Sequence, residues 1–382
     1  MRDFTFDTTP SVIFGAGSIR RIGELIRARL GTRALVVTDA GLVRAGLVAP
    51  ALDALERSGV AVAVYDAVVA DPPESLVLAA ADAARAHGAD CVVGLGGGSS
   101  LDVAKVVALV ARSGEALADI YGVGLARGPR LPLMLVPTTA GTGSEVTPIS
   151  ILTTGAHEKR GVVTRLIIPD VALLDPDLTL GLPPAVTAAT GVDAMVHAIE
   201  AYTSASPNNN PLSRALALEA LRLLGANIRR AVHEGGDREA RSGMLLGSML
   251  AGQAFANSPV AAVHALAYPL GGHFGIPHGL SNALVLPQVL RFNAPACGAL
   301  YAEIAPHALP DLAPVAGADG FVTGIERLCA ELGLPPRLRD AGVPESALDL
   351  LADDAMKQTR LLVNNPRPLT RNDARAIYGA AW

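Results

Sequence analysis

The sequence predicts two domains of different class, a doubly wound α/β domain over residues 1–183 and an all-helical domain over residues 184–382. Before Pro183-Pro184, short apolar runs alternate with helical stretches, which is the pattern of a parallel sheet covered by helices. Beyond it, long helical stretches follow one another. The length of 382 residues is enough for two or three domains.

The elements of the first half are placed by hydrophobic pattern and by turn residues. Ala34–Thr38 is a continuous apolar run of the kind that a parallel sheet buries on both faces. Strands are expected at Ser11–Phe14, Ala34–Thr38, Val60–Tyr65, Cys91–Leu95, Leu133–Val136, Ile149–Leu152 and Val171–Leu174. Helices are expected at Ile19–Leu30, Leu47–Ser58, Glu74–His87 and Leu101–Ala111.

In the second half, helices are expected at Ala185–Thr203, Leu212–His233, Arg238–Asn257 and Val260–Leu270, with more beyond Pro277. Ser258 and Pro259 suit the N-cap and the first turn of the fourth of these helices. His273 follows two glycines and is expected in a loop.

Composition narrows the class of protein. A net charge of −5 without a basic cluster argues against a nucleic-acid partner. The three cysteines are far apart and form neither a disulfide framework nor a zinc-finger spacing, so a reducing cytoplasm is expected. No apolar run reaches the roughly 20 residues that a membrane span needs, and the first residues do not read as a signal peptide.

A glycine-rich loop, Gly96-Gly97-Gly98-Ser99-Ser100, stands between an expected strand and an expected helix. Consecutive glycines let the backbone approach a pyrophosphate, and the helix N-terminus offers N–H groups and positive potential. The alternative is an ordinary strand-to-helix turn. Asp102, in the first helical turn, can cap the helix but would repel a phosphate if its carboxylate pointed there.

Two further positions are typical of a nucleotide site. Asp39 ends its strand, where a carboxylate accepts hydrogen bonds from a ribose 2′-hydroxyl and repels a 2′-phosphate, which favours NAD over NADP. Its alternative role is an N-cap. Thr138, Thr139 and Thr142 offer hydroxyls to a carboxamide or a second phosphate, with a structural hairpin as the alternative.

The segment Ser242–Leu290 contains no Asp, Glu, Lys or Arg, yet it contains His264, His273 and His278. An ion in apolar surroundings is costly without compensating partners, and a metal ion would be one reason to place imidazoles there. The alternative is a buried helix pair whose histidines are only hydrogen-bonded.

Asp193 and His197 lie four residues apart on an expected helix and therefore share a face. Together with His264 and His278 they make a complete ligand set for Fe²⁺ or Zn²⁺. Glu200 shares their face and could orient a ligand. Tyr268, four residues after His264, could relay a proton or simply pack.

Several motifs resemble the iron-containing (group III) alcohol dehydrogenase family. They are Gly96–Lys105, Pro137–Glu145, Asp175–Thr179, Leu182–Pro184, Gly191–Tyr202 and His264–Asn293. The resemblance covers residues 10 to 295. It implies a Rossmann-like dinucleotide domain followed by a helical metal-binding domain, the dehydroquinate synthase-like or group III alcohol dehydrogenase fold, with a cleft between the two domains.

The resemblance also implies an activity, an NAD-dependent alcohol dehydrogenase or aldehyde reductase that contains Fe²⁺ or Zn²⁺ and forms homodimers or larger assemblies. Its metal ligands are matched by Asp193, His197, His264 and His278. Its nucleotide contacts are matched by Asp39, Gly96, Gly97, Gly98, Ser99, Asp102, Thr138, Thr139, Thr142 and Lys159. We take His264, His278 and Tyr268 as the catalytic candidates, and an apolar pocket for a small alcohol or aldehyde is expected.

The chain departs from the family pattern at a few positions. Tyr268 stands where many members have histidine, and Asp71 where many have asparagine. The basic segment Lys159–Arg165 favours a rival, a maleylacetate-reductase-like enzyme acting on an unsaturated oxo-acid. A second rival, a dehydroquinate-synthase-like cyclase, would need basic residues that the segment His264–His278 does not supply.

Overall fold

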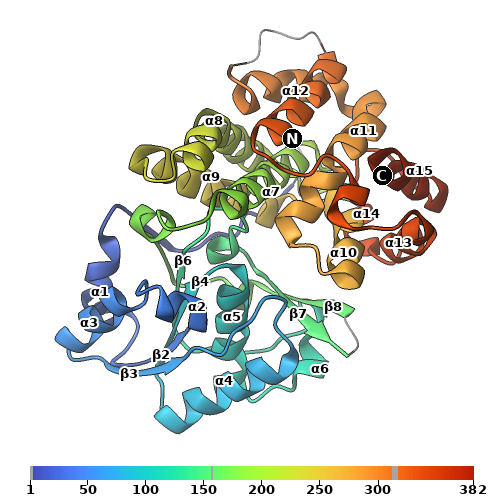
Figure 1. The fold of residues 1–382 in the computed structure, drawn as a ribbon. Helices are drawn as coiled ribbons and strands as arrows, with labels where there is room; N and C mark the ends of the chain where they lie inside the picture. Colours follow the sequence, from blue (N-terminus) through green and yellow to red (C-terminus); the bar gives the residue numbers. More distant parts are fainter. Residues whose placement is uncertain (1–2, 156–157, 312–316) are drawn as a thin grey trace. The chain divides into compact units, whose positions relative to one another are not determined.

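The computed structural model describes residues 3–155, 158–311 and 317–382. These residues form two compact units (Figure 1). The α/β unit contains Asp7–Thr139 and Gly143–Leu180, and the helical unit contains the residues up to Phe6, Ala140–Thr142 and Gly181–Trp382. The predicted combination of a parallel α/β sheet with a helical domain is confirmed, while a domain boundary at residue 183 stays a prediction.

The α/β unit is built on a six-stranded parallel sheet with the order β1-β9-β6-β4-β2-β3. Its strands are β1 (Ser11–Phe14), β2 (Arg33–Val37), β3 (Ala61–Tyr65), β4 (Cys91–Gly96), β6 (Leu133–Pro137) and β9 (Val171–Leu174). The chain runs outward from β2 to β3 and then returns to the other side of β2 for β4. This reversal is the topological switch point at which open α/β sheets bind ligands.

Helices cover both faces of this sheet, which explains why its inner strands β4, β6 and β9 are apolar and buried along their whole length. Leu35 and Val37 of β2 face a core shared with α4 (Glu74–His87) and α5 (Gly98–Ser113). Their neighbours Ala34 and Val36 belong to a second core, which is shared with α1 (Ile22–Arg29) and α3 (Ala49–Arg57). Because successive side chains point to opposite faces, both sets are buried.

A second sheet of three strands contains β5 (Gly122–Val123), β7 (Ile149–Thr154) and β8 (Glu158–Val163), in the order β5-β8-β7. Strand β8 was not predicted from the sequence. The strand begins with Glu158, Lys159 and Arg160, so it lacks the apolar run on which strand prediction depends. Its antiparallel pairing with β7, and not its composition, makes this segment a strand.

The helical unit is organised around α7 (Pro184–Thr203), in which every residue from Gly191 to Thr203 is buried. Its other α-helices are α8 (Pro211–His233), α9 (Arg238–Asn257), α10 (Ala262–Phe274), α11 (His278–Ala308), α12 (Gly317–Glu331), α13 (Leu348–Ala355), α14 (Thr359–Leu362) and α15 (Arg371–Ala381). Helix α7 packs against α8, α9 and α11, and α11 packs against α10. None of the helices in the described residues is long and apolar enough to cross a membrane.

Two expectations about α10 were wrong. Ser258 and Pro259 do not start this helix: Ser258 ends α9, its hydroxyl donates to the Ala201 carbonyl at 2.7 Å, and α10 begins at Ala262. At the other end, α10 continues through Pro269 to Phe274, so His273 is helical rather than in a loop. The stop signal is Gly275, whose φ of 64° provides the left-handed C-terminal cap.

Gly279, near the start of α11, allows this helix to approach α7. A Cβ atom added at Gly279 would lie 2.4 Å from the Ala189 carbonyl oxygen of α7 and 3.3 Å from the Asp193 Cβ. A backbone oxygen cannot move aside as the end of a flexible side chain can. The missing side chain of Gly279 therefore sets the spacing between the helices that carry His278 and Asp193.

We expect Gly279→Ala to force α11 away from α7 and to lower the free energy of unfolding by about 1–3 kcal/mol, as overpacking does. The purified variant should also retain less divalent metal. Thermal unfolding and elemental analysis measure the two effects. The control is Gly271→Ala in α10, where the nearest atom to an added Cβ is 3.5 Å away; equal behaviour of the two variants would contradict the prediction.

Candidate active site

Four side chains of the helical unit converge on one point. Asp193 and His197 come from α7, His264 from α10 and His278 from α11. One potential ligand atom from each of the four lies within 4.8 Å of the other three. The Asp193 Oδ1 atom is 3.9 Å from His264 Nε2 and 3.6 Å from His278 Nε2. The structure thus brings together the four residues that the sequence singled out as metal ligands.

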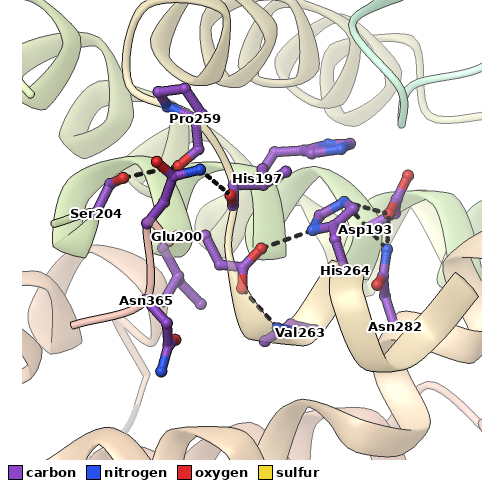
Figure 2. A network of polar contacts seen from close by, with 12 residues as sticks. Asp193, His197, Glu200, Ser204, Pro259, Val263, His264, Asn282 and Asn365 are labelled. Atoms are coloured by element: carbon purple, nitrogen blue, oxygen red, sulfur yellow. Dashed lines mark hydrogen bonds and ion pairs between the residues drawn. The ribbon is translucent and has the colours of Figure 1, made fainter. Parts of the chain in front are cut away.

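Hydrogen bonds to groups outside the cluster orient two of the imidazoles. His197 Nδ1 lies 3.2 Å from the carbonyl oxygen of Gly141, and His264 Nδ1 lies 2.6 Å from Glu200 Oε2. Glu200 Oε1 also accepts from the backbone N–H of Val263 at 2.7 Å (Figure 2). Because these oxygens accept, both Nδ1 atoms donate, which leaves each Nε2 with a lone pair for an ion.

The pKa values of two members of the cluster are shifted toward the protonation states that a metal needs. Burial alone would raise the pKa of Asp193, but the three imidazoles and a hydrogen bond from Asn282 lower that pKa below its usual value. Burial lowers the pKa of His197 to about 3, so that imidazole is neutral at physiological pH. One carboxylate and three imidazole nitrogens are a donor set that suits a divalent iron or zinc ion.

Three of the four residues of the cluster are buried. Asp193, His197 and His264 have between 1% and 4% of their surface exposed, whereas the His278 side chain is 41% exposed. The Tyr268 ring lies beside His278, with 5.9 Å between the ring centroids. A buried ligand set with one accessible side is typical of catalytic metal sites, which keep one position open.

His273 takes no part in this cluster. Although it also lies in the uncharged segment, its imidazole contacts the carboxylate of Asp354 in α13. His273 therefore contacts a residue outside the cluster, and its predicted loop position was wrong.

In the α/β unit, the expected nucleotide residues follow three neighbouring strands. Asp39 comes after β2, Gly96 ends β4 and is followed by Gly97–Ser99, and Thr138 with Thr139 comes after β6; these strands are adjacent in the sheet. The backbone N–H of Thr138 donates to the Gly96 carbonyl at 2.9 Å. Because the carboxyl ends of parallel strands meet at one edge, the sheet gathers these residues at its switch point.

The start of α5 has the features of an anion cradle. Gly97 is its N-cap, and no side chain caps the helix. Gly96 has a φ of 156°, and a Cβ atom there would lie 2.7 Å from the Ser100 Cβ. The site therefore offers N–H groups and the positive end of a helix where only glycine fits. This observation supports the phosphate loop over an ordinary turn.

Several of the expected nucleotide residues form hydrogen bonds or ion pairs within the protein. The Asp102 carboxylate accepts from the Ser144 hydroxyl at 2.6 Å and from the backbone N–H of Ile151 at 2.9 Å. Lys159 forms an ion pair with Asp71 and donates to the Thr153 hydroxyl at 3.2 Å. Thr142 belongs to the short segment of the helical unit. The Asp39 carboxylate caps α2 (Ala40–Arg44) by accepting from Leu42 N–H at 3.0 Å, which uses one of its two oxygens.

Sequence reasoning missed the role of Lys105. Its ammonium group is fully buried and donates to Ser144 Oγ at 2.8 Å, Thr147 Oγ1 at 3.0 Å and Ile149 O at 2.8 Å. Burial lowers its pKa to about 8. These bonds tie α5 to the segment from Ser144 to Ile149, which follows Thr138, Thr139 and Thr142 in the chain. The available signal was the spacing of Lys105, three residues after Asp102 on one helix face.

Glu145, which lies in the same segment, is a buried carboxyl group with 2% of its surface exposed. Its Oε1 atom has no hydrogen-bond partner among the described residues. Burial raises its pKa to about 7. Within this unit, the folded chain therefore binds a proton at Glu145 that the unfolded chain releases at a lower pH.

A pH dependence of stability follows from Glu145. A pKa that is higher in the folded state gives stability that is complete below about pH 4.5 and is lost as the pH rises through about 7. We expect Glu145→Gln to remove this part of the decline, which is worth roughly 3 kcal/mol at most, because one pKa unit corresponds to about 1.4 kcal/mol. Urea unfolding of both proteins between pH 5 and 8 measures it; parallel curves would refute the assignment.

Glu200 supplies a second prediction, because both of its oxygens accept hydrogen bonds. Glutamine has only one acceptor oxygen, so Glu200→Gln leaves either Val263 N–H or His264 Nδ1–H without an acceptor. We expect metal affinity to fall by roughly 10–100-fold, as measured by competition with a chelator. Glu303→Gln is the matched control, because Glu303 accepts from Tyr202 OH at 2.6 Å and contacts no ligand. An equal loss in both variants would contradict the prediction.

Known proteins and protein-family models match nearly the whole chain. A family model described as iron-containing alcohol dehydrogenase matches residues 9–176, and one described as the C-terminal part of the Fe-containing alcohol dehydrogenase family matches residues 187–382. Long-chain-alcohol dehydrogenase 1 of Geobacillus thermodenitrificans is 46% identical over 93% of this chain and 91% of its own length.

Solved structures give the same result. The crystal structure of a 1,3-propanediol oxidoreductase has a TM-score of 0.95 and 36% identity, with 100% of both chains covered. Sulfoacetaldehyde reductase from Bifidobacterium kashiwanohense, solved in complex with NAD⁺, has a TM-score of 0.89 and 30% identity over 99% of this chain and 98% of its own.

Proposed function

This chain belongs to the iron-containing alcohol dehydrogenase family and is an oxidoreductase, and we propose that it transfers a hydride reversibly between a small alcohol and NAD⁺ with one divalent metal ion. The observation that carries the proposal is the convergence of one carboxylate and three imidazoles within 4.8 Å. Two of these imidazoles donate through Nδ1 and therefore keep Nε2 for an ion.

Asp193, His197, His264 and His278 would hold the ion. Iron or zinc in this position supplies a Lewis acid, which polarises the oxygen of an alcohol or a carbonyl group. The accessible side of His278 is where we place the substrate oxygen, because the other three ligands are buried. Tyr268 lies beside His278, and we assign its phenol to proton transfer, with packing against the imidazole as the competing role.

For the nucleotide, we place the pyrophosphate at Gly96–Ser99, where the uncapped start of α5 offers N–H groups. NAD⁺ supplies the hydride acceptor. Asp39 at the end of β2 favours a free ribose hydroxyl and so favours NAD over NADP. The NAD⁺ complex of the related sulfoacetaldehyde reductase supports this choice. We propose further contacts with the nucleotide from Thr138, Thr139, Asp102, Thr142 and Lys159. Asp102 would act indirectly, by holding Ser144 and Ile151 in place through its hydrogen bonds.

The substrate class is a small alcohol or aldehyde. Relatives are named for long-chain alcohols, 1,3-propanediol and lactaldehyde, so the family alone selects no single compound. The case for an unsaturated oxo-acid is weaker than the sequence suggested. Two cations of the basic segment are engaged, since Lys159 pairs with Asp71 and Arg160 lies 4.6 Å from the centre of the Tyr121 ring. A cytoplasmic location and a homodimer stay predictions.

The test is NADH consumption against a panel of aldehydes, ketones and oxo-acids, before and after metal removal. We expect aldehyde reduction to disappear with the metal and to return with Fe²⁺ or Zn²⁺. His264→Ala and His278→Ala should each lower turnover by at least about 10²-fold, because Lewis-acid stabilisation is worth several kcal/mol. NADPH should be a poorer donor than NADH.

His273→Ala is the matched control, because this histidine lies on the same helix as His264 but contacts Asp354. It should keep its metal and its activity. Turnover that survives in a metal-free His264→Ala protein would contradict the proposed function. Oxo-acid reduction without aldehyde reduction would favour the maleylacetate-reductase-like rival.

A further inference from the structure

The side-chain amide of Asn282 lies among the four candidate ligands. Its Nδ2 atom is 2.6 Å from Asp193 Oδ1 and 3.3 Å from His264 Nε2 (Figure 2). The same atom is 3.3 Å from His278 Nε2. Asn282 is fully buried and follows His278 by one turn of α11, so both side chains leave the same face of the helix. It thus contacts three of the four atoms that would hold an ion.

These three contacts are not equivalent. An amide group has two N–H hydrogens, so it cannot donate to three acceptors at once. The contact with Asp193 is the shortest, and a hydrogen bond to an ionised group is stronger than one between neutral groups. The bond to Asp193 is therefore the main one, and the two imidazoles share what remains.

The lone pairs decide which contacts can coexist with an ion. A neutral imidazole has one acceptor nitrogen with one lone pair, which either accepts a hydrogen bond or binds a metal. A carboxylate oxygen has more than one acceptor site, so Asp193 Oδ1 can accept from Asn282 and bind an ion together. Ion binding would end the contacts of Asn282 with His264 and His278 but not its bond to Asp193.

The orientation of the amide is fixed from the nitrogen side. Asn282 Oδ1 is buried and has no hydrogen-bond partner among the described residues. Reversing the amide would bring this oxygen against the carboxylate oxygen of Asp193, where two acceptors repel each other. Asp193 therefore holds Asn282 in place, and Asn282 in turn holds the carboxylate.

We propose that Asn282 is a positioning residue of the metal centre, whose amide holds Asp193 Oδ1 between His264 and His278 in the orientation that an ion requires. It is not a ligand in this proposal. The inference rests on the proposed function only in so far as the four-residue cluster binds an ion. The contact of Asn282 with the ligands would also reduce the repulsion among the acceptor atoms in the ion-free chain.

The test is the affinity for Zn²⁺, measured by competition with a chromogenic chelator. Asn282→Leu has a similar shape but no donor, and Asn282→Ala leaves the space open. We expect both variants to bind Zn²⁺ roughly 10–100-fold more weakly, the usual loss when a partner of a ligating carboxylate is removed. Two variants of different size separate the lost hydrogen bond from a packing defect, and circular dichroism identifies those that fold.

The control is Asn293→Ala on the same helix. Asn293 is also buried, and it exchanges two hydrogen bonds, of 2.9 and 2.8 Å, with Asn365 rather than with any ligand. Its variant should unfold at a lower temperature yet bind Zn²⁺ as the wild type does. A loss of affinity in the Asn282 variants alone thus reports positioning and not general destabilisation.

Unchanged Zn²⁺ affinity in a folded Asn282 variant would overturn the proposal. Tighter binding would overturn it as well, because Asn282 would then compete with the ion. A wild-type protein that binds no Zn²⁺ or Fe²⁺ would instead remove the proposed metal centre. Normal Zn²⁺ binding without aldehyde reduction would contradict the proposed function and leave the role of Asn282 standing.

Discussion

The buried carboxylate of Asp193 is the constraint on which the helical unit depends. It lies in the interior beside three imidazoles, while the segment that supplies two of them, Ser242–Leu290, contains no Lys or Arg. A buried carboxylate is costly unless a positive charge or hydrogen-bond donors compensate it. Where the Nδ1 atom of an imidazole donates to another acceptor, as in His264, the Nε2 atom that faces Asp193 carries no proton. A bound cation is therefore the partner that this arrangement needs, and Asn282 is the neutral donor that it has.

The packing of the helices follows from bringing these atoms together. Gly279 lets α11 approach the backbone of α7, and Gly141 fits beside Thr190, whose Cβ would lie 2.7 Å from a Cβ added at Gly141. The close approach of Gly141 also supplies the carbonyl that orients His197. Backbone proximity and ligand orientation are thus one feature of the structure, because the same glycine permits the approach and accepts the hydrogen bond.

How much could be read from the sequence depended on whether the information was local. The parallel strands were predicted because burial on both faces makes the inner ones almost entirely apolar, and the glycine-rich loop was predicted because only glycine suits its backbone. Strand β8 was missed because pairing with β7, rather than composition, creates it. The end of α10 was misplaced because Gly271 looks like a stop signal, although the left-handed residue is Gly275. Asn282 and Lys105 had the right helical spacing, but many side chains do, and only tertiary structure reveals their partners.

The family relationship limits which residues can determine the choice of substrate. Relatives named for quite different alcohols and aldehydes match this chain along nearly its whole length, so membership of the family does not by itself select a substrate. A side chain that selects a substrate must instead lie near the accessible ligand without binding the ion. Tyr268 meets both conditions, since it neighbours the exposed His278 and departs from the histidine of many family members. A phenol there is larger than an imidazole and carries a hydroxyl instead of two ring nitrogens, so the same position can change both the shape of the pocket and the proton transfer that we propose for Tyr268.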